Sequence, residues 1–498
     1  MLKNNIIFFS NSGNSYLFSY KDKEFIPLHP VLKSIILLKQ QDITDNELYS
    51  HIELESYPTE IIKRYIDKYN YLVDNTFLTN EDIGIKEFGK LNKHIIDRQI
   101  NDLKVLTFEV TDKCNLRCRY CAYGDMYSGY DERKSKNMSF ETAKHLLDYL
   151  FNRWENSISI SEERNIAVGF YGGEPLMNFK LIQKIVEYIS KNLPSSINVM
   201  YNMTTNALLL DRHIDYLIKH NFKLLVSLDG AEEDNCERVT PKNKNSFSII
   251  YRNLKNIQIT NPEYFKKNIA FNSVFHSKSD VNRIVDFFKR EFDKTTQLSE
   301  INNSGIKDEK KFSLLQKSVF KSIDNSSRSL KIDKELMYNS PRISNLTYFL
   351  HHLSNEVYKD YRLLLYGDKK YSLLNTGSCV PFERKMYLTV NGRILVCERI
   401  DHEFSVGYVT ENGVELDTDK IAKKYNYYCK KLHHQCRSCY SQASCSQCMF
   451  YLNIKEKNVK CHNYKSGTKF AEYLSLNVTY LENNSWAYKR VMNEITIF

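Results

Sequence analysis

The sequence lacks any long apolar run. No stretch approaches the roughly 20 consecutive apolar residues that a helix needs to span a bilayer. The start, MLKNNIIFFSNSGNSY, has one lysine before a four-residue apolar run, whereas the apolar core of a secretory signal has roughly 7 to 15 residues. We therefore expect no membrane partner and a cytoplasmic location.

Clustered charge is also missing. The chain has 70 Lys and Arg against 60 Asp and Glu, and its formal net charge is +10. The basic residues are scattered along the sequence, which differs from the basic patch typical of nucleic-acid binding. We expect no nucleic-acid partner, but we expect a surface that attracts acidic peptides.

Internal repeats and extended low-complexity tracts are absent as well. A chain of 498 residues exceeds one ordinary hydrophobic core, and at about 150 residues per domain it predicts two to four units. The composition, 42% apolar and 26% charged, is typical of a globular protein.

Cysteine, by contrast, is abundant. The chain has twelve cysteines, and eight of them lie between residues 379 and 461. Thiols stay reduced in the cytoplasm, so disulfides are not expected there. Clustered thiolates instead indicate metal binding.

Residues 1–95 predict a small α+β module in the style of a winged helix. The patterns indicate three short strands followed by three helices, and the helices are expected at 29–40, 42–52 and 58–73. Two roles stay open for this module: a cap that shields the next domain, or a docking site for a peptide.

Residues 96–292 alternate buried strand patterns with amphipathic helix patterns. This βαβ rhythm predicts a parallel sheet, either a barrel or an open doubly wound sheet, with its site at the carboxyl ends of the strands. The expected strands are 103–111, 165–173, 197–206, 222–230 and 268–275. Residues 293–375 are predicted to form a helical bridge, in which the charged run 307–311 is a solvated face. A cysteine-rich unit is expected over 376–498.

Three cysteines follow the first of these strands in the stretch TDKCNLRCRYCA. Cys114, Cys118 and Cys121 are spaced as C-x3-C-x2-C. An iron-sulfur cubane normally takes four thiolates, so three can hold three irons and leave the fourth open for another molecule. A structural zinc site with a distant fourth ligand is the alternative, although zinc motifs usually pair their cysteines as C-x2-C.

This motif, with Tyr120 just before its last cysteine, resembles the signature of the radical S-adenosylmethionine (SAM) enzymes. The resemblance implies a partial (β/α)6 TIM-type barrel, in which the open iron binds SAM and its reductive cleavage yields a 5'-deoxyadenosyl radical. Further positions resemble the family's SAM contacts: Gly172, Gly173, Glu174, Ser227, Asp229 and Arg238. The glycines allow close backbone approach, and Glu174 would accept from the SAM ammonium.

The cysteine pattern beyond residue 376 resembles a SPASM domain, which carries two auxiliary clusters in radical SAM enzymes that act on peptides. By that resemblance one cluster is held by Cys436, Cys439, Cys445 and Cys461. The other is held by Cys379, Cys397 and Cys448. The resemblance thus implies three [4Fe-4S] clusters together with SAM.

The fourth ligand of the second auxiliary set stays open. Some relatives place it six residues after the first cysteine, where this sequence has Lys385. Cys429 could complete the site, or a substrate thiolate could bind an open iron. Cys236 could donate a hydrogen atom, as a cysteine does in radical epimerases, although an ordinary cysteine at a helix start is the simpler interpretation.

The resemblance implies an enzyme that modifies a ribosomally made precursor peptide through a thioether or other side-chain crosslink. The N-terminal module resembles leader-recognition domains, and the expected partners are a precursor peptide with its leader and an electron donor such as flavodoxin or ferredoxin. A sulfatase-type formylglycine maturase, a peptide epimerase and a non-enzymatic iron-sulfur protein are the alternatives.

Overall fold

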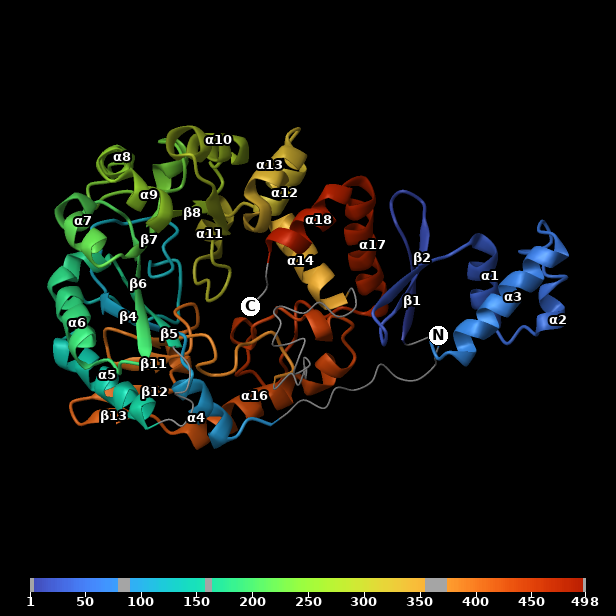
Figure 1. Ribbon diagram of the computed structural model, residues 1–498, viewed down its shortest axis with the longest axis horizontal. Helices are drawn as coiled ribbons and strands as arrows, with labels where there is room; N and C mark the ends of the chain where they lie inside the picture. Colours follow the sequence, from blue (N-terminus) through green and yellow to red (C-terminus); the bar gives the residue numbers. More distant parts are fainter. Residues whose placement is uncertain (1–3, 79–89, 157–163, 354–373, 496–498) are drawn as a thin grey trace.

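The computed structural model describes residues 4–78, 90–156, 164–353 and 374–495. Figure 1 shows a strand-rich region surrounded by helices at one end and a small module at the other. A cysteine-rich region of helices and loops lies between them. Within the described residues, no helix is long and apolar enough to cross a membrane.

The N-terminal module has the predicted element order of three strands and then three helices. Its antiparallel sheet has the order β1-β2-β3, and a turn containing Gly13, at φ 87°, joins the first two strands. Thr44 and Glu47 form a capping box at the start of the second helix. The elements are β1 Asn5–Phe9, β2 Ser15–Ser19, β3 Glu24–Pro27, α1 Pro30–Lys39, α2 Asp45–Leu48 and α3 Thr59–Asp74.

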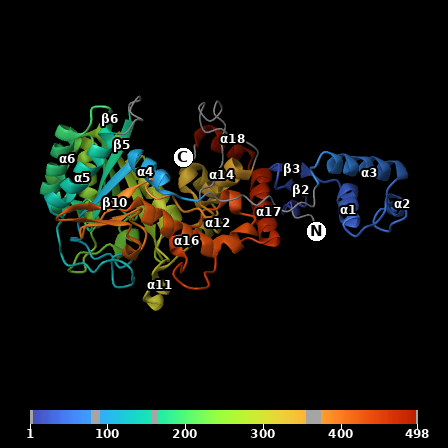
Figure 2. The ribbon, with the colours of Figure 1, turned by 90° about the horizontal axis from the view of Figure 1, so that it is seen from below.

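This module rests on the C-terminal helix α17, Gly467–Asn483, as both ribbon views show (Figures 1 and 2). Phe8 and Phe18 share an apolar cluster with residues of α14 (Pro341–Leu353), α17 and α18 (Ser485–Glu494). Glu482 on α17 accepts hydrogen bonds from Asn14 Nδ2, at 2.8 Å, and from the Tyr16 hydroxyl. The first two strands are thus held against the end of the chain, and β3 pairs only with β2 among the described strands.

A central sheet of ten strands contains the predicted parallel strands. Six of them run in parallel in chain order, so the α/β expectation is confirmed, and the near-continuous burial of β4 is typical of a strand covered on both faces. The sixth strand continues the sheet beyond residue 292, where the sequence analysis ended the barrel. The six are β4 Val105–Thr111, β5 Arg164–Gly172, β6 Ile197–Thr205, β7 Lys223–Ser227, β8 Ile269–Phe275 and β9 Thr296–Glu300.

Helices between these strands cover the outside of the sheet (Figure 1). On α6 the buried residues Leu181, Ile182, Ile185, Val186 and Ile189 follow a helical period and face the core. Ser139 caps α5 and Asp280 caps α10 by accepting from backbone N–H groups. The helices are α4 Lys93–Asn101, α5 Phe140–Glu155, α6 Phe179–Asn192, α7 Leu210–Lys219, α8 Phe247–Thr260, α9 Pro262–Asn268 and α10 Val281–Phe292.

The region beyond β9 is helical up to residue 353. The predicted helical bridge ends here with α14, and its residues 354–373 lie outside the described residues. The other helices are α11 Glu309–Leu315, α12 Val319–Asp324 and α13 Ser329–Leu336.

The cysteine-rich segment extends the same sheet. Strand β10 pairs in parallel with β4, and three antiparallel strands continue from it. The sheet therefore crosses residue 376, where the sequence analysis began a separate unit. The elements here are β10 Met386–Leu388, β11 Arg393–Leu395, β12 Gly407–Thr410, β13 Gly413–Glu415 and the long helix α16 Thr418–Arg437.

Glu109 joins β4 to the turn after β10. Its carboxylate accepts a hydrogen bond of 2.9 Å from the Val390 N–H. Burial raises the pKa of Glu109 from its ordinary value of 4.5 to about 7, although this hydrogen bond and the charge of Arg133 lower it. Because the folded-state pKa is the higher one, the protonated carboxyl favours folding below about pH 4.5, and this stability is lost as pH rises to about 7.

Glu109→Gln is therefore expected to raise the melting temperature of the cluster-free protein more at pH 8 than at pH 5. Gln keeps an oxygen acceptor for Val390 N–H, and it removes a charge whose burial costs about 1 to 3 kcal/mol. Thermal unfolding of both proteins at the two pH values measures this difference. Glu232→Gln, at an exposed position, is the control and should show no such pH dependence.

Candidate active site

The three cysteines of the C-x3-C-x2-C motif lie in the loop that follows β4, at the carboxyl end of the parallel sheet. Backbone hydrogen bonds hold this loop on two sides. Arg117 N–H donates to Val239 O at 2.6 Å, and Arg119 N–H donates to Glu237 O at 3.0 Å. On the other side, Glu174 N–H donates to Lys113 O at 2.8 Å. The loop is therefore fixed between the ends of β5 and β7.

Most of the predicted SAM contacts line one cavity with these cysteines. The cavity has a volume of about 450 Å³, which is within the range of small-molecule sites. Of the predicted site residues, it is lined by Cys114, Cys118, Tyr120, Cys121, Gly172, Gly173, Glu174, Ser227 and Arg238. Segments more than a hundred residues apart thus converge at the carboxyl ends of β4, β5 and β7, as expected for a parallel sheet.

Asp229 is the exception among the predicted contacts. It is fully buried and is not among the described residues that line the cavity. Its carboxylate accepts from Arg238 Nε and from Val274 N–H, each at 2.9 Å, and also from the Tyr120 hydroxyl. Asp229 therefore holds Arg238 and Tyr120 in place from behind, and Arg238 Nη1 lies 4.0 Å from Cys118 Sγ.

Glu174 is buried beside the cluster loop. Its carboxylate accepts from the Thr205 hydroxyl and Asn206 N–H, each at 2.7 Å, and from Leu176 N–H at 3.2 Å. Burial raises its pKa from 4.5 to about 7, while these hydrogen bonds lower it. A carboxylate has about four acceptor positions, so one stays available for a donor such as an ammonium group.

The sulfur atoms of this site suit a cluster better than a zinc ion. Burial raises the pKa of Cys118 to about 12, with Arg238 acting in the opposite direction, and a bound metal would be needed to deprotonate the thiol at neutral pH. Within the described residues, no three cysteine sulfurs lie within 4.8 Å of one another. Sulfur ligands of tetrahedral zinc are about 3.8 Å apart, so the wider spacing leaves room for several iron atoms.

Four of the C-terminal cysteines line a second cavity of about 270 Å³. They are the predicted set Cys436, Cys439, Cys445 and Cys461. Burial raises the pKa of Cys436 to about 12, and the thiols of the other three raise it further. Four converging thiols could hold a complete cubane.

The remaining predicted cysteines surround Tyr425 on α16. Burial raises the pKa of Tyr425 well above its ordinary value, and the thiols of Cys448, Cys379, Cys397 and Cys429 raise it further. The Tyr425 hydroxyl is buried without a hydrogen-bond partner in the described part of the chain. Buried hydroxyls are normally satisfied, and a sulfur of a bound cluster would supply the acceptor.

Lys385 and Cys429, the two residues that bear on the open ligand position, differ in their surroundings. Lys385 is paired with Glu398, with Nζ 2.9 Å from Oε2, and an ammonium group cannot ligate iron. The Cys429 thiol raises the pKa of both Tyr425 and Cys436, so it lies near both cysteine sets. The assignment of Cys429 stays a prediction.

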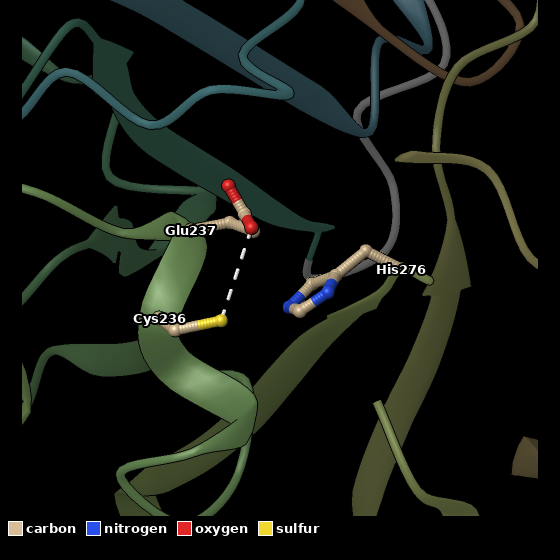
Figure 3. A group of neighbouring side chains, drawn as sticks. All are labelled: Cys236, Glu237 and His276. Carbon is tan, nitrogen blue, oxygen red and sulfur yellow. Dashed lines mark hydrogen bonds between the residues drawn. The ribbon is translucent and has the colours of Figure 1, made fainter. Parts of the chain in front are cut away.

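Cys236 lies close to Glu237 and His276, as Figure 3 shows. Its Sγ is 3.8 Å from Glu237 Oε1, and the same carboxylate binds Arg119 and Lys278. His276 Nε2 donates to Asp234 O at 2.7 Å, and its Nδ1 accepts from Lys278 N–H at 3.3 Å. Cys236 is not among the described residues that line the cavity, so its position does not favour a hydrogen-donor role.

Several cavity residues carry no signal in the sequence. Arg133 reaches Cys121 Sγ at 4.0 Å and stacks on Tyr123, with 4.4 Å from Cζ to the ring centroid. Lys311, from the charged run predicted to be a solvated face, also lines the cavity, as does Glu300. Arg133 lies in a loop and Glu300 at the end of β9, where no periodicity marks them, and Lys311 lies on α11. Asn206, by contrast, ends a predicted strand, and its Nδ2 donates to Asn115 Oδ1 at 2.7 Å.

Comparisons with known proteins agree with this site. The profile of the radical SAM superfamily matches residues 108–266. An uncharacterized protein of Methanocaldococcus jannaschii is 39% identical over 134 residues, which are 27% of this chain and 41% of that protein. The cysteine-type anaerobic sulfatase-maturating enzyme of Clostridium novyi is 24% identical over 384 residues, 74% of this chain and 94% of the enzyme.

The radical SAM cyclopropyl synthase TigE of Paramaledivibacter caminithermalis is 26% identical over 260 residues, 50% of this chain and 52% of TigE. This chain therefore spans about half the length of TigE, and less of the archaeal protein. The solved structure of native anSMEcpe with bound AdoMet and Cp18Cys peptide is 18% identical, with a TM-score of 0.49, over 79% of this chain and 99% of that one.

The cysteine loop after the first strand and the matching superfamily profile lead to one assignment. Residues 108–266 of this chain form a radical SAM domain.

Proposed function

We propose that this protein modifies a ribosomally made precursor peptide by forming a thioether or another side-chain crosslink. The convergence of two further cysteine sets, one in a cavity of its own and one around Tyr425, carries this proposal. The names of two relatives, a sulfatase-maturating enzyme and a cyclopropyl synthase, support chemistry on a polypeptide or its side chains.

The proposed roles follow from the positions of the residues. Cys114, Cys118 and Cys121 would hold a cluster whose open iron binds SAM, and Arg238 and Glu174 would bind the carboxylate and ammonium groups of SAM. When bound, the clusters supply the electron that cleaves SAM and take up electrons from the substrate. The two other cysteine sets would hold two auxiliary clusters.

The hydrogen and electron balance of a crosslink explains the need for further clusters. A new bond between two side chains removes two hydrogen atoms. One is transferred to the 5'-deoxyadenosyl radical and leaves in 5'-deoxyadenosine, and the other leaves as a proton and an electron. The electron requires an acceptor of low potential, for which an auxiliary cluster is suited. An electron donor such as flavodoxin or ferredoxin would supply the electron for SAM cleavage.

The N-terminal module would recognise the leader of the peptide. Strand β3 pairs with β2 on one side only among the described strands, and an extended leader could add to its other edge by backbone hydrogen bonds. On this proposal, a peptide without its leader binds the enzyme more weakly. The same residues of the peptide are still modified.

The test uses anaerobically reconstituted enzyme, SAM, dithionite and the small cysteine-containing peptide encoded beside the gene. A product about 2 Da lighter, formed with 5'-deoxyadenosine, supports a crosslink because two hydrogen atoms are lost. Formation of 5'-deoxyadenosine with an unchanged peptide mass indicates epimerisation. Failure to cleave SAM under any of these conditions would leave the non-enzymatic iron-sulfur alternative.

Formylglycine formation on a sulfatase is the second candidate. It is favoured by one observation, the alignment with 94% of the sulfatase-maturating relative. That alignment leaves the rest of this chain unmatched, and a leader-binding module would have no role in sulfatase maturation. A synthetic sulfatase peptide distinguishes the two candidates, since conversion of its cysteine to formylglycine lowers the mass by about 18 Da.

Removal of one auxiliary ligand should lower the iron content in a defined step. Three clusters would give about 12 iron atoms per chain, and Cys461→Ala is expected to lower this to about 8, because the fourth iron of this cluster would then have neither a thiolate nor SAM as its ligand. Iron and sulfide analysis of the reconstituted protein measures the change. Cys236 lies outside all three cysteine sets, so Cys236→Ala should leave the iron content at the wild-type value.

A further inference from the structure

A groove next to the SAM cavity lies where the barrel meets the cysteine-rich region. We refer to it as the junction groove. Its volume is about 320 Å³, within the range of ligand sites. One wall consists of barrel loops, including Ser128, Tyr130, Asn302, Ser304 and Gly305. The other consists of residues 399–404 and 450–456, including Arg399, Glu403 and Lys455.

The junction groove adjoins the SAM cavity. Asn302 lines both, and its carbonyl accepts from the Tyr127 hydroxyl at 2.7 Å. Tyr130 lines the groove and packs on Tyr123, which lines the cavity, with ring centroids 5.0 Å apart. The groove and the cavity of the three cysteines are therefore neighbours, with Asn302 and the Tyr123–Tyr130 pair between them.

Backbone contacts fix the two walls relative to each other. Gly129, at φ 99°, accepts a hydrogen bond from His402 N–H at 2.9 Å, and a Cβ at this position would lie 2.0 Å from Asp401 Oδ2. The barrel loop of residues 126–130 is also joined to residues 305–307, because Ser128 N–H donates to Gly305 O at 2.8 Å. The groove is thus a formed part of the fold.

Arg399 is the basic residue of the groove that has no ion-pair partner within the described residues, and its side chain is exposed. The other basic residue, Lys455, is paired with Glu403. Two further acidic residues, Asp401 and Glu456, also line the groove. The charge of Arg399 lowers the pKa of Tyr171, which lines the SAM cavity, against a larger upward effect of burial, so Arg399 lies near that cavity.

We propose that the substrate peptide reaches the SAM cavity through the junction groove and that Arg399 binds an acidic side chain of this peptide. This inference rests on the proposed function and adds to it a residue that determines specificity. A guanidinium can bind a carboxylate through two parallel hydrogen bonds. Such a contact would fix which residue of the peptide faces the radical, because it sets the distance along the chain from the acidic residue to the cavity.

The test combines Arg399 variants with charge variants of the peptide encoded beside the gene. Binding of the dye-labelled peptide is measured by fluorescence anisotropy, and modification is measured by mass spectrometry. We expect Arg399→Gln to raise the Kd and KM for the peptide by about tenfold with little change in kcat, as for loss of one charged contact made equally in ground and transition states. Arg212→Gln, on the exposed face of α7, should change neither value.

Charge reversal identifies the partner on the peptide. Each Asp or Glu of the peptide is changed in turn to Lys, and one of these peptides should bind Arg399→Glu better than the unchanged peptide does. Ser304→Trp adds a large side chain to the barrel wall of the groove. It should weaken peptide binding although Arg399 is unchanged. 5'-Deoxyadenosine formed without peptide reports whether each variant keeps an intact SAM site.

The outcomes separate this inference from the proposed function. If the wild-type enzyme cleaves SAM but neither binds nor modifies the peptide, both are overturned. If it modifies the peptide, and Arg399→Gln and Ser304→Trp leave Kd and KM unchanged, the inference alone is overturned. Rescue of Arg399→Glu by one Lys-containing peptide establishes the contact.

Discussion

Cys118→Ala is expected to abolish formation of 5'-deoxyadenosine. Cys118 lies between Cys114 and Cys121 in the loop after β4, and its Sγ faces Arg238 at 4.0 Å. Two thiolates cannot hold a cubane that already lacks its fourth protein ligand. The variant should therefore lose the cluster of the SAM cavity and, with it, both SAM cleavage and peptide modification. Anaerobic reconstitution followed by iron analysis and chromatography of 5'-deoxyadenosine measures both losses.

Cys236→Ala is the matched control. Cys236 lies on the segment that carries Arg238, but it is outside the described lining of the cavity, so iron content and SAM cleavage should match those of the wild type. Cleavage of SAM by Cys118→Ala at the wild-type rate would contradict the assignment of this loop as the cluster site. Zinc in place of iron in the anaerobically purified wild type would contradict it equally.

Gly173→Ala is expected to remove SAM binding and to disturb the cluster loop. A Cβ on Gly173 would lie 2.0 Å from Lys113 O and 2.8 Å from Asp112 O. These atoms belong to backbone that leads directly into Cys114, and Glu174 N–H donates to the same Lys113 carbonyl at 2.8 Å. Since a rigid backbone cannot yield as a flexible side chain does, the two loops must separate. We expect a fall of at least about a hundredfold in SAM affinity, because two buried contacts are lost together.

Gly467→Ala is the control for the substitution itself. A Cβ at Gly467, the first residue of α17, would be 3.6 Å from the Tyr440 ring, an ordinary contact. Equilibrium dialysis of SAM with the reconstituted proteins compares the two variants. If Gly173→Ala binds SAM with wild-type affinity, SAM binding does not depend on the close approach of the loops after β4 and β5.

Runs of apolar residues in the sequence predicted the barrel strands well, because these strands have buried positions that need apolar side chains. Residues 103–111 and 197–206 were expected as strands, and the structure places β4 and β6 there, since buried parallel strands carry continuous apolar runs. The N-terminal element order was predicted for a similar reason, because Gly13 and the cap at Thr44 act within a few residues. Strand β9, TQLSE, was missed because it is short and polar at four of its five positions.

The cysteine motif was predictable because its ligands are adjacent in sequence. Spacing alone indicates that Cys114, Cys118 and Cys121 can share one cluster. The surrounding charges were not predictable in this way. Lys311 was assigned to a solvated face, but α11 brings it to the cavity. Asp229 was expected to contact SAM, but the structure buries it behind Arg238.

The sequence by itself determined the cysteine motif after the first strand and the parallel strands, because each depends on the order and spacing of nearby residues. Long-range packing decided the rest. It joined β10 to β4, set the first two strands against α17, and brought Arg399 beside Asn302 in the junction groove. Such contacts depend on how surfaces far apart in the sequence fit together. The hydrophobic period and the local turn residues do not predict that fit.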